Sequence, residues 1–301
     1  MYDLIIIGAG PAGITAAVYA ARKKMQFLVL TQDIGGQAAW SADVENYTGY
    51  QLITGADLAR RFEEHMRQYA IAVHEQEPVE SVVAEGYRIV VRTARAAYET
   101  RTVIIASGKR SRELGVPGEK EFRNRGLTYC ATCDGPLFAK KDVAVIGGGN
   151  SALDAALQLV RFCSRVYVIN DAPRLGGDEI AQDKLLEAKN AQVFNNARVT
   201  GIEGDKFVKA VTMRQEGARR RLDVQGVFVE IGLLPNSGFA KEVGKNESGE
   251  IIVDCSNTTS VPGVFAAGDV TTVPEKQIII AAGEGAKACL TAFRYLNQHR
   301  F

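Results

Sequence analysis

Short apolar runs and longer helical segments alternate along the first thirty residues. Residues 3–8 are apolar and largely branched, residues 14–24 are rich in alanine, and residues 27–30 are apolar again. A glycine-rich turn, Gly8 to Gly13, separates the first run from the alanine-rich segment. Short apolar runs of this kind predict buried strands, and alanine favours helix. The predicted order is strand, turn, helix, strand, within the ~30 residues of a dinucleotide-binding unit.

The same order returns in the middle of the chain. Residues 143–146 and 166–170 predict strands, and residues 153–161 predict a helix. The turn before this helix runs from Gly147 to Ala152, where alanine takes the place of the third glycine, an accepted variant. One glycine motif is weak evidence, but two in the same context predict two dinucleotide sites rather than two plain turns.

Each glycine of such a turn has its own purpose. The first permits the tight turn, the second lets the backbone approach a pyrophosphate, and the third permits close packing of helix on strand. The helix N-terminus then places free N–H groups and the positive end of the helix dipole beside the phosphate charge. The residues predicted at the two pyrophosphates are Gly8, Gly10, Pro11, Ala12 and Gly13 in the first unit and Gly147, Gly149, Asn150 and Ser151 in the second.

The C-terminal part completes the first unit. Residues 263–269 predict a strand that ends in Asp269, and residues 277–296 predict a long helix. The Asp269 carboxylate could accept hydrogen bonds from the sugar hydroxyls of a cofactor, with a plain cap or turn role as the alternative. The predicted fold is therefore α/β, with two Rossmann-like (three-layer ββα) dinucleotide-binding domains, the second inserted into the first. We expect the first domain at residues 1–113 and 240–301, and the inserted domain at residues 114–239.

Length and charge narrow the class of protein. A chain of 301 residues is long enough for about two domains. The 36 basic and 35 acidic residues give a net charge of +1 without a basic stripe, so no nucleic-acid partner is expected. The N-terminus does not read as a signal peptide, and no run approaches the ~18 apolar residues of a membrane span. We expect a cytoplasmic protein without a membrane partner.

Two of the five cysteines, Cys130 and Cys133, are close in sequence. Two intervening residues allow a small disulfide ring that opens and closes reversibly, and such motifs commonly lower a thiol pKa. Asp134 is adjacent and could pass a proton to a departing thiolate. A metal site needs about four ligands, and no second such pair or histidine cluster is present, so no metal is expected. The remaining alternative is an inert buried pair.

With its motifs in this order along the sequence, the chain resembles the low-molecular-weight thioredoxin reductase family, and the resemblance covers essentially the whole length of the chain. The resemblance is carried by Gly8 to Gly13, Gly35-Gly36-Gln37, Glu45-Asn46, Cys130 to Gly135, Gly147 to Ala152 and Gly268-Asp269-Val270. Within the family, Val229 to Asn236 and Gly268 to Lys287 are similar to the flavoprotein subunit of alkyl hydroperoxide reductase. That subunit has an additional N-terminal thioredoxin-like region. Because this sequence starts at the flavin motif, we expect any such relay to be a separate protein.

The resemblance implies FAD in the outer domain and a nicotinamide nucleotide in the inserted one. Besides the first turn, it assigns to FAD Thr31, Gln32, Gly35, Gly36, Gln37, Asn46, Val83, Ala106, Gly108, Gly268, Asp269, Lys276, Gln277 and Ile278. It assigns to the nicotinamide nucleotide, besides the second turn, Asn170, Asp171, Ile231 and Gly232.

The same resemblance implies roles for the cysteine segment. Cys133 would face the flavin, Cys130 would attack the partner's disulfide, and Asp134 would donate the proton. Family members are homodimers in which the inserted domain swings, so that the cysteines and the nicotinamide take turns at the flavin. The implied partner is a thioredoxin or glutaredoxin-like protein.

The electron donor depends on the residues after the second strand of the inserted unit. Members that use NADPH carry a His-Arg-Arg cluster there, which holds the 2′-phosphate. This chain has Asn170, Asp171 and, further on, Arg174. A carboxylate repels a 2′-phosphate and can bind a free ribose hydroxyl, so Asp171 favours NADH over NADPH. The alternatives are Asp171 as a solvated turn residue, Arg174 alone serving a 2′-phosphate, and a donor such as ferredoxin.

The sequence therefore predicts an enzyme that passes electrons from NADH through FAD to the Cys130–Cys133 disulfide and on to a thioredoxin-like disulfide. One alternative keeps this chemistry with a donor other than a nicotinamide. Another is an FAD-dependent NADH oxidase with vestigial cysteines, and a third is a non-catalytic redox sensor that binds FAD.

Overall fold

The computed structural model describes residues 1–40, 43–44, 46–129 and 131–299, and for Trp40, Asp43, Thr132 and Cys133 it describes the backbone alone. The chain forms two compact units. Unit 1 comprises Met1–Arg110 and Leu234–Phe301, and unit 2 comprises Ser111–Leu233.

The predicted domain boundaries at residues 113 and 240 lie a few residues further along the chain than the unit boundaries at Arg110 and Leu234. The chain leaves unit 1 through strand β9 (Lys109–Ser111) and returns through strand β18 (Leu233–Pro235), and these two strands pair with each other.

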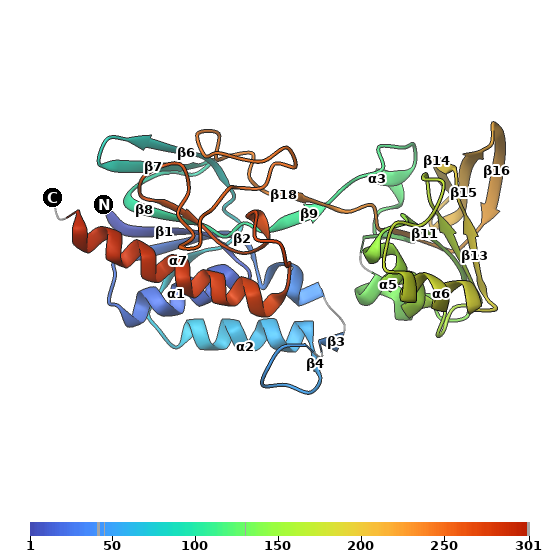
Figure 1. The fold of residues 1–301 in the computed structure, drawn as a ribbon, viewed down its shortest axis with the longest axis horizontal. Coiled ribbons are helices and arrows are strands. Elements are labelled where there is room, and N and C mark those ends of the chain that lie inside the picture. The colour runs from blue at the N-terminus through green and yellow to red at the C-terminus, as the bar shows by residue number, and fades with distance from the viewer. Residues whose placement is uncertain (41–42, 45, 130, 300–301) are drawn as a thin grey trace. The chain divides into compact units, whose positions relative to one another are not determined.

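Unit 1 is built on a seven-stranded sheet in the order β5-β2-β1-β8-β7-β6, with β19 also paired to β8 (Figure 1). Its strands are β1 (Tyr2–Ala9), β2 (Phe27–Ile34), β5 (Ala72–His74), β6 (Val79–Glu85), β7 (Arg88–Thr93), β8 (Ala97–Ile105) and β19 (Val264–Ala266). Strands β5, β2, β1, β8 and β19 are parallel, whereas β6, β7 and β8 form an antiparallel meander. The helices are α1 (Pro11–Arg22), α2 (Gly55–Arg67) and α7 (Ile278–Gln298), with short elements η1 (Gly36–Trp40), β3 (Asp43–Val44), β4 (Ile53–Thr54) and η3 (Gly268–Val270).

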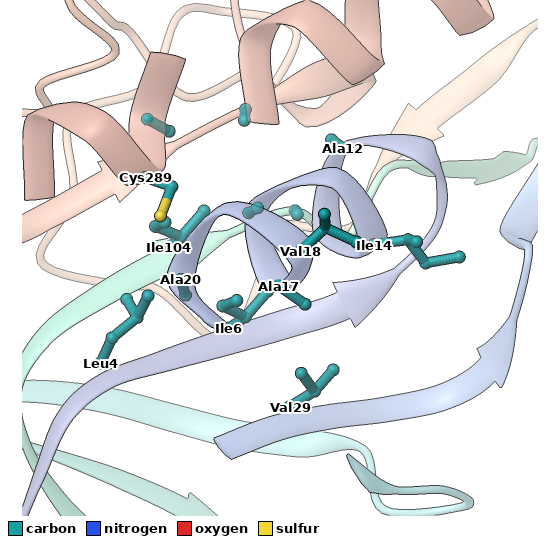
Figure 2. Packing of buried hydrophobic residues seen from close by; sticks show 14 of the residues in the cluster. Leu4, Ile6, Ala12, Ile14, Ala17, Val18, Ala20, Val29, Ile104 and Cys289 are labelled. Carbon is teal, nitrogen blue, oxygen red and sulfur yellow. The ribbon is translucent and has the colours of Figure 1, made fainter. Parts of the chain in front are cut away.

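Strand β1 is apolar throughout because both of its faces are covered. Leu4 and Ile6 pack in one buried cluster with residues of α1 and α7 (Figure 2), whereas Ile5 and Ile7 pack in a second cluster with the loops before β19. Successive strand side chains point to opposite faces, so a sheet buried on both sides needs a continuous apolar run.

Helices α1 and α7 pack closely because the residues between them are small. Ala12 and Ala16 on α1 and Ala288 and Ala292 on α7 belong to the same buried cluster, in which Figure 2 labels Ala12 on α1 and Cys289 on α7. The two helices approach closely at Gly285, where a Cβ atom would lie 2.0 Å from the Ala12 carbonyl oxygen. This contact places the start of α7 beside the glycine turn that precedes α1.

Unit 2 repeats the layered plan with a parallel five-stranded sheet in the order β10-β17-β11-β12-β13. These strands are β10 (Leu127–Thr128), β17 (Gly226–Val229), β11 (Asp142–Ile146), β12 (Arg165–Ile169) and β13 (Ala191–Phe194). An antiparallel sheet of β14 (Ala197–Gly204), β15 (Val208–Gln215) and β16 (Ala218–Asp223) packs on it, with α3 (Glu119–Phe122), α4 (Ala131–Asp134), α5 (Asn150–Leu159), α6 (Glu179–Glu187) and η2 (Gly135–Phe138).

The two predicted Rossmann-like units are confirmed, with small differences at element ends. Helix α1 begins at Pro11 rather than at residue 14, because proline is favourable in a first helical turn. It ends before Lys24, whose φ of 55° is left-handed. The strand predicted at 263–269 is shorter, since Gly268 has a φ of 75° and begins the turn η3. Within the described ranges, no helix is long and apolar enough to cross a membrane.

Candidate functional site

A cavity of about 1050 Å³ opens in unit 1 at the carboxyl ends of its parallel strands. Its lining includes Gly8 after β1, Thr31 on β2, Ala106 after β8 and Asp269 after β19. In open α/β sheets, ligands bind in the crevice at the carboxyl ends of the strands. The volume is at the upper end of the range for cofactor sites and fits an extended dinucleotide.

The turn between β1 and α1 is shaped to bring backbone close to a ligand. Gly8 has a φ of 102°, and a Cβ there would lie 2.4 Å from the Ala106 carbonyl oxygen. A Cβ on Gly13 would lie 1.9 Å from the Gly8 carbonyl oxygen. By contrast, a Cβ on Gly10, the residue before α1, would meet no described atom within 4 Å. The space beside Gly10 and the N-terminus of α1 therefore fits a pyrophosphate.

One end of the cavity lies beside β2 and the segment that follows β5. Thr31 accepts a hydrogen bond from the Ala9 backbone N–H at 3.1 Å, which fixes the end of β2 against the glycine turn. Gln32, Asp33 and Glu77 line the cavity nearby. In this fold the ribose next to the adenine lies at the end of the second strand, so this end fits the adenosine of a dinucleotide.

Glu77 is a buried carboxylate held in place by its neighbours. It accepts hydrogen bonds from Thr93 Oγ1 and Tyr98 OH, each at 2.8 Å, and pairs with His74 and Arg95. Burial raises the pKa of Glu77, but these hydrogen bonds and charges outweigh it, and the net pKa lies below the ordinary value. Burial, together with the bond to Glu77, raises the pKa of Tyr98 to about 12. The backbone N–H of Glu77 also donates to the Thr31 carbonyl, which joins this cluster to β2.

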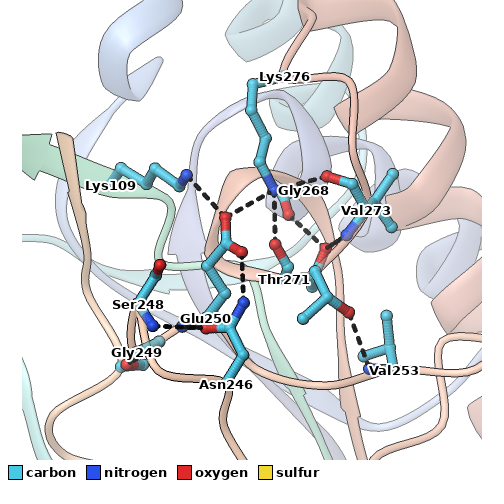
Figure 3. A network of polar contacts seen from close by, with 12 residues as sticks. Lys109, Asn246, Ser248, Gly249, Glu250, Val253, Gly268, Thr271, Val273 and Lys276 are labelled. Atoms are coloured by element: carbon cyan, nitrogen blue, oxygen red, sulfur yellow. Dashed lines mark hydrogen bonds and ion pairs between the residues drawn. The ribbon is translucent and has the colours of Figure 1, made fainter. Parts of the chain in front are cut away.

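A network of charges, which we call the lysine–glutamate cluster, lies at the other end (Figure 3). It consists of Lys109, Glu250 and Lys276, and both lysines line the cavity. Glu250 Oε1 lies 2.9 Å from Lys109 Nζ and 3.2 Å from Lys276 Nζ. Burial raises the pKa of Glu250, but its hydrogen bonds with both lysines and Asn246 outweigh burial and lower it to about 2. Glu250 is therefore ionised at neutral pH.

Asp269 lies in the cavity lining near this cluster. Burial raises its pKa, and the charges of Lys276 and Lys109 oppose that rise. Two amide side chains complete this end: Asn46 Nδ2 donates to Gln277 Oε1 at 3.0 Å, and Gln37 Nε2 donates to the Lys109 carbonyl at 3.0 Å. Polar groups from separate segments of unit 1 thus converge on one end of the cavity.

Most of the residues assigned to FAD from the sequence line this cavity. They are Gly8, Gly10, Pro11, Ala12, Thr31, Gln32, Gly36, Gln37, Asn46, Ala106, Gly108, Gly268, Asp269, Lys276, Gln277 and Ile278. The lining does not include Gly13, Gly35 or Val83. Gly13 and Gly35 instead meet neighbouring elements closely. Val83 lies on β6 four residues beyond Val79, which does line the cavity, and at ~3.3 Å per residue that is about 13 Å further along.

The sequence reasoning missed several lining residues. These are Asp33, Glu77, Glu80, Lys109, Arg110, Asn236 and Phe239. Asp33 had a usable signal, because it stands at the end of β2 where the fold places a ribose. Glu80 lies on strand β6, and the remaining residues come from short or irregular segments whose position depends on contacts made far along the chain.

The second glycine turn in unit 2 has the same backbone plan as the first. Gly147 has a φ of 138°, and a Cβ there would lie 2.1 Å from the Glu230 carbonyl oxygen. A Cβ on Gly149, the residue before α5, would meet no described atom within 4 Å. Asn150 Oδ1 accepts from the Asp178 backbone N–H at 2.7 Å, so this predicted nucleotide residue holds the loop before α6. Ser151 follows it in the first turn of α5.

The residues after β12 differ in what their side chains can reach. Asn170 is buried, and its amide nitrogen donates to the Ala172 carbonyl and to Asn195 Oδ1. Asp171 is exposed, as is Arg174. Asp171 therefore stands at the solvent-exposed end of the second strand of this unit, where the fold places an adenosine ribose. Ile231 and Gly232 follow β17, with Gly232 at a φ of 97°.

Cys130 lies outside the described residues, and the Cys133 side chain is not described. Next to them, Asp134 ends α4, and its Oδ2 accepts a hydrogen bond from Thr128 Oγ1 at 2.5 Å. Strand β10 ends at Thr128, so the cysteine segment begins two residues beyond the carboxyl end of a parallel strand. Among the described residues, no group of three or more His, Cys, Asp or Glu could hold a metal ion.

Glu230 accepts a hydrogen bond from the backbone N–H of Ala131, which follows Cys130 directly. Burial raises the pKa of Glu230, the bond from Ala131 opposes that rise, and the charge of Asp154 adds to it, so that the pKa lies at about 7. Strand β17 pairs with β10 through Phe228 and Thr128, so its end lies beside the start of the cysteine segment. The sequence reasoning did not single out Glu230.

Glu230 should make stability depend on pH. Its ordinary pKa is 4.5 and its folded pKa is about 7, so the fold favours the protonated carboxyl. The stabilisation is complete below pH 4.5 and is lost as the pH rises through about 7. A Glu230→Gln variant should lose this dependence and gain about 3 kcal/mol over the unaltered chain at pH 8. The free energy of unfolding in guanidinium, measured from pH 4 to pH 8, tests this prediction. The exposed Glu187→Gln variant is the control, and parallel curves for all three proteins would contradict the assignment.

Two α/β units, each with a glycine turn at the carboxyl end of a parallel strand, define a two-domain dinucleotide-binding protein of the Rossmann type. Residues 2–285 match the family model described as pyridine nucleotide-disulphide oxidoreductase. The chain belongs to that family, whose members are FAD-binding oxidoreductases.

Known relatives agree with this assignment. The chain is 43% identical over 304 residues to the F subunit of alkyl hydroperoxide reductase of Escherichia coli (strain K12), a match that covers 98% of this chain and 58% of that protein. It is 42% identical over 298 residues to a protein named NADH dehydrogenase of Bacillus subtilis (strain 168), with the same two coverages of 98% and 58%. The chain thus spans little more than half the length of these curated relatives.

A solved structure covers nearly the whole chain. The crystal structure of Lactococcus lactis thioredoxin reductase (FR conformation) is similar with a TM-score of 0.88 and 35% sequence identity, over 99% of this chain and 100% of that one. The resemblance to the low-molecular-weight thioredoxin reductases that the motifs predicted is therefore confirmed.

Proposed function

We propose that this chain is a thioredoxin reductase-like flavoenzyme that passes electrons from NADH through FAD to the Cys130–Cys133 disulfide and on to a thioredoxin-like protein disulfide. The observation that carries the proposal is the cavity of about 1050 Å³ over the Gly8–Gly13 turn, in a chain that also has the segment Cys-Ala-Thr-Cys-Asp-Gly. The solved relative named thioredoxin reductase and the curated alkyl hydroperoxide reductase relative support it.

FAD fits the cavity of unit 1. The pyrophosphate would lie beside Gly10 and the N-terminus of α1, and the adenosine beside Gln32. The flavin half would then extend toward the lysine–glutamate cluster, with Asp269 accepting bonds from the sugar-alcohol chain. When bound, FAD supplies a group that takes two electrons from a nicotinamide and returns them to a disulfide.

The cysteine pair carries the exchange with the partner. The Cys130 thiolate attacks one sulfur of the partner's disulfide, which forms a mixed disulfide and releases the other partner sulfur as a thiolate. Asp134, held by Thr128, supplies a proton to that thiolate. The Cys133 thiolate then attacks the Cys130 sulfur, which closes the Cys130–Cys133 disulfide and releases the second partner sulfur as a thiolate. The partner gains two electrons, and bound FAD would supply the two electrons that reopen the Cys130–Cys133 pair.

NADH is the proposed donor because of Asp171. Its carboxylate is exposed at the end of β12, where it would accept bonds from a free ribose hydroxyl and repel a 2′-phosphate. The Bacillus subtilis relative is named an NADH dehydrogenase, which supports the same donor. The proposed partner is a thioredoxin or glutaredoxin-like protein, and the proposed assembly is a homodimer.

Anaerobic stopped-flow absorbance tests the donor. The FAD-loaded protein should lose its flavin absorbance at least tenfold faster with NADH than with NADPH, because Asp171 disfavours the phosphate by about 1.4 kcal/mol or more. An Asp171→Arg variant should narrow or reverse this preference, while exposed Asp183→Arg in α6 should not. If neither nucleotide reduced the flavin but dithionite did, the donor assignment would fail and ferredoxin would be tested next.

Steady-state assays with a thioredoxin-like disulfide test the acceptor. NADH consumption that matches the thiol formed on the partner supports disulfide reduction. NADH consumption that instead matches peroxide, and survives loss of both cysteines, would establish an oxidase. If the chain bound FAD but catalysed no reaction between any donor and acceptor, the remaining function would be that of a non-catalytic redox sensor.

A further inference from the structure

Lys109 occupies an unusual position for a lysine. It lies at the start of β9, its side chain is 12% exposed, and it lines the cavity of unit 1. Lysine is almost never this buried unless it is paired. Here the pairing partner is Glu250, whose Oε1 lies 2.9 Å from Lys109 Nζ (Figure 3).

The second lysine of the cluster is already fully occupied. Lys276 Nζ donates to the Thr271 and Val273 carbonyls, each at 2.6 Å, and lies 3.2 Å from Glu250 Oε1 (Figure 3). An ammonium group has three donors, so these partners account for all of them. Lys276 therefore fixes the loop between η3 and α7, whereas Lys109 has donors left to face the cavity.

Glu250 is held so that it can position Lys109. Asn246 Nδ2 donates to Glu250 Oε2 at 2.8 Å, and Asn246 Oδ1 accepts from the backbone N–H groups of Ser248 and Glu250 (Figure 3). The Lys109 carbonyl is fixed as well, since Gln37 donates to it. Both ends of Lys109 are thus anchored, which keeps its charge at one place in the cavity wall.

This charge lies at the flavin end of the cavity. If FAD placed its pyrophosphate at Gly10 and its adenosine at Gln32, its other half would extend toward Lys109 and Gln277, which line the same cavity. The other charges that line this end are Arg110, which is exposed, Lys276 and Asp269. Reduction of a flavin by a hydride adds two electrons and one proton, which leaves one extra negative charge to be stabilised. A fixed positive charge in a partly buried site is suited to that role.

We propose that Lys109, positioned by Glu250, supplies a fixed positive charge that stabilises the reduced flavin and so raises its midpoint potential. This inference rests on the proposed function, because it needs FAD in the cavity. It goes beyond that function, because it assigns to a single residue the control of how strongly the flavin holds electrons.

The test is the midpoint potential of the bound flavin in the intact chain, measured by anaerobic equilibration with a dye of known potential. Lys109→Met should lower the ratio of reduced to oxidised flavin at a fixed potential by about tenfold, which is about 30 mV for a two-electron couple. Lys109→Arg should restore most of the ratio. Lys241→Met removes an exposed charge of unit 1 that lies outside the cavity lining and should change the ratio less than about twofold, because solvent screens it.

Glu250→Gln separates an electrostatic role from a structural one. Removing the negative charge should raise the ratio of reduced to oxidised flavin, opposite to Lys109→Met, whereas loss of structure would move both variants the same way. Sulfite is a second probe, because its flavin adduct is also negatively charged. Lys109→Met should weaken sulfite binding by about tenfold.

The outcomes distinguish this inference from the proposed function. An unchanged potential and unchanged sulfite affinity in Lys109→Met that still binds FAD would overturn the role of Lys109 alone. If Lys109→Met fails to bind FAD, the potentials of Lys109→Gln and Glu250→Gln decide by the same criterion. Absence of NADH or partner turnover with the potential shifts intact would overturn only the proposed function. An unaltered chain that binds no flavin would overturn both.

Discussion

A Cys130→Ser variant should reduce a thioredoxin-like disulfide at least about a thousandfold more slowly than the unaltered chain, with its flavin still reduced by NADH at the normal rate. A serine hydroxyl is far less acidic and less nucleophilic toward sulfur than a thiol. In the proposed reaction the flavin accepts electrons before the cysteines act, so only the later half of the reaction should be lost. Stopped-flow flavin reduction and steady-state reduction of the partner, on the same preparation, separate the two halves.

The matched control is Cys255→Ser. Cys255 is an exposed free cysteine in unit 1, outside the glycine turns and the cysteine motif, so its replacement should change neither half of the reaction. Retention of partner reduction by Cys130→Ser would exclude the proposed attack by Cys130. Loss of flavin reduction in the same variant would instead place the defect before the cysteine step.

Two glycines of helix α7 should respond to the same substitution in opposite ways. At Gly285 a Cβ would lie 2.0 Å from the Ala12 carbonyl oxygen, and both atoms belong to packed backbone. Gly285→Ala must therefore push α7 away from α1, at a cost of about 3 kcal/mol or more. Since α1 carries the glycine turn and α7 follows Gln277, the FAD affinity should fall at least about a hundredfold. Guanidinium unfolding and FAD titration of the apoprotein measure these effects.

Gly283→Ala is the control on the same helix. Gly283 is exposed, and a Cβ there would meet no described atom within 4 Å. Alanine should stabilise this helix by about 0.5–1 kcal/mol, because it restricts the unfolded chain and is the better helix former. Equal effects of the two substitutions would contradict the close approach of α1 and α7.

The sequence predicted those parts of the fold that depend on local pattern. The apolar run of β1 specifies a strand. Within a few residues, Gly8 and Gly13 specify the turn and the helix that follow it. The same holds for Gly147 to Ala152 in unit 2. Element ends were less predictable because Pro11 extends α1 at one end, and the left-handed Lys24 stops it at the other.

The charged groups of the candidate site could not be predicted in the same way. Lys109 and Glu250 are 141 positions apart, and no local motif links them. Glu77 follows a three-residue strand, β5, that carries too few residues to show a periodic pattern. Glu230 differs from an ordinary surface glutamate only through its burial and its bond to Ala131. Such groups are defined by tertiary contacts, which composition and spacing do not encode.

The pairing of the two crossing strands bears on whether unit 1 can fold without unit 2. On either side of the crossing, Gly108 and Asn236 are joined by the Asn236 N–H bond to the Gly108 carbonyl at 2.9 Å. Ser107 Oγ also donates to the Asn236 carbonyl at 2.6 Å. If a short β-turn replaced unit 2, it would therefore join the two crossing strands and complete unit 1. Excision of unit 2 at this crossing, with the two strands joined by a short turn, should leave a self-contained domain.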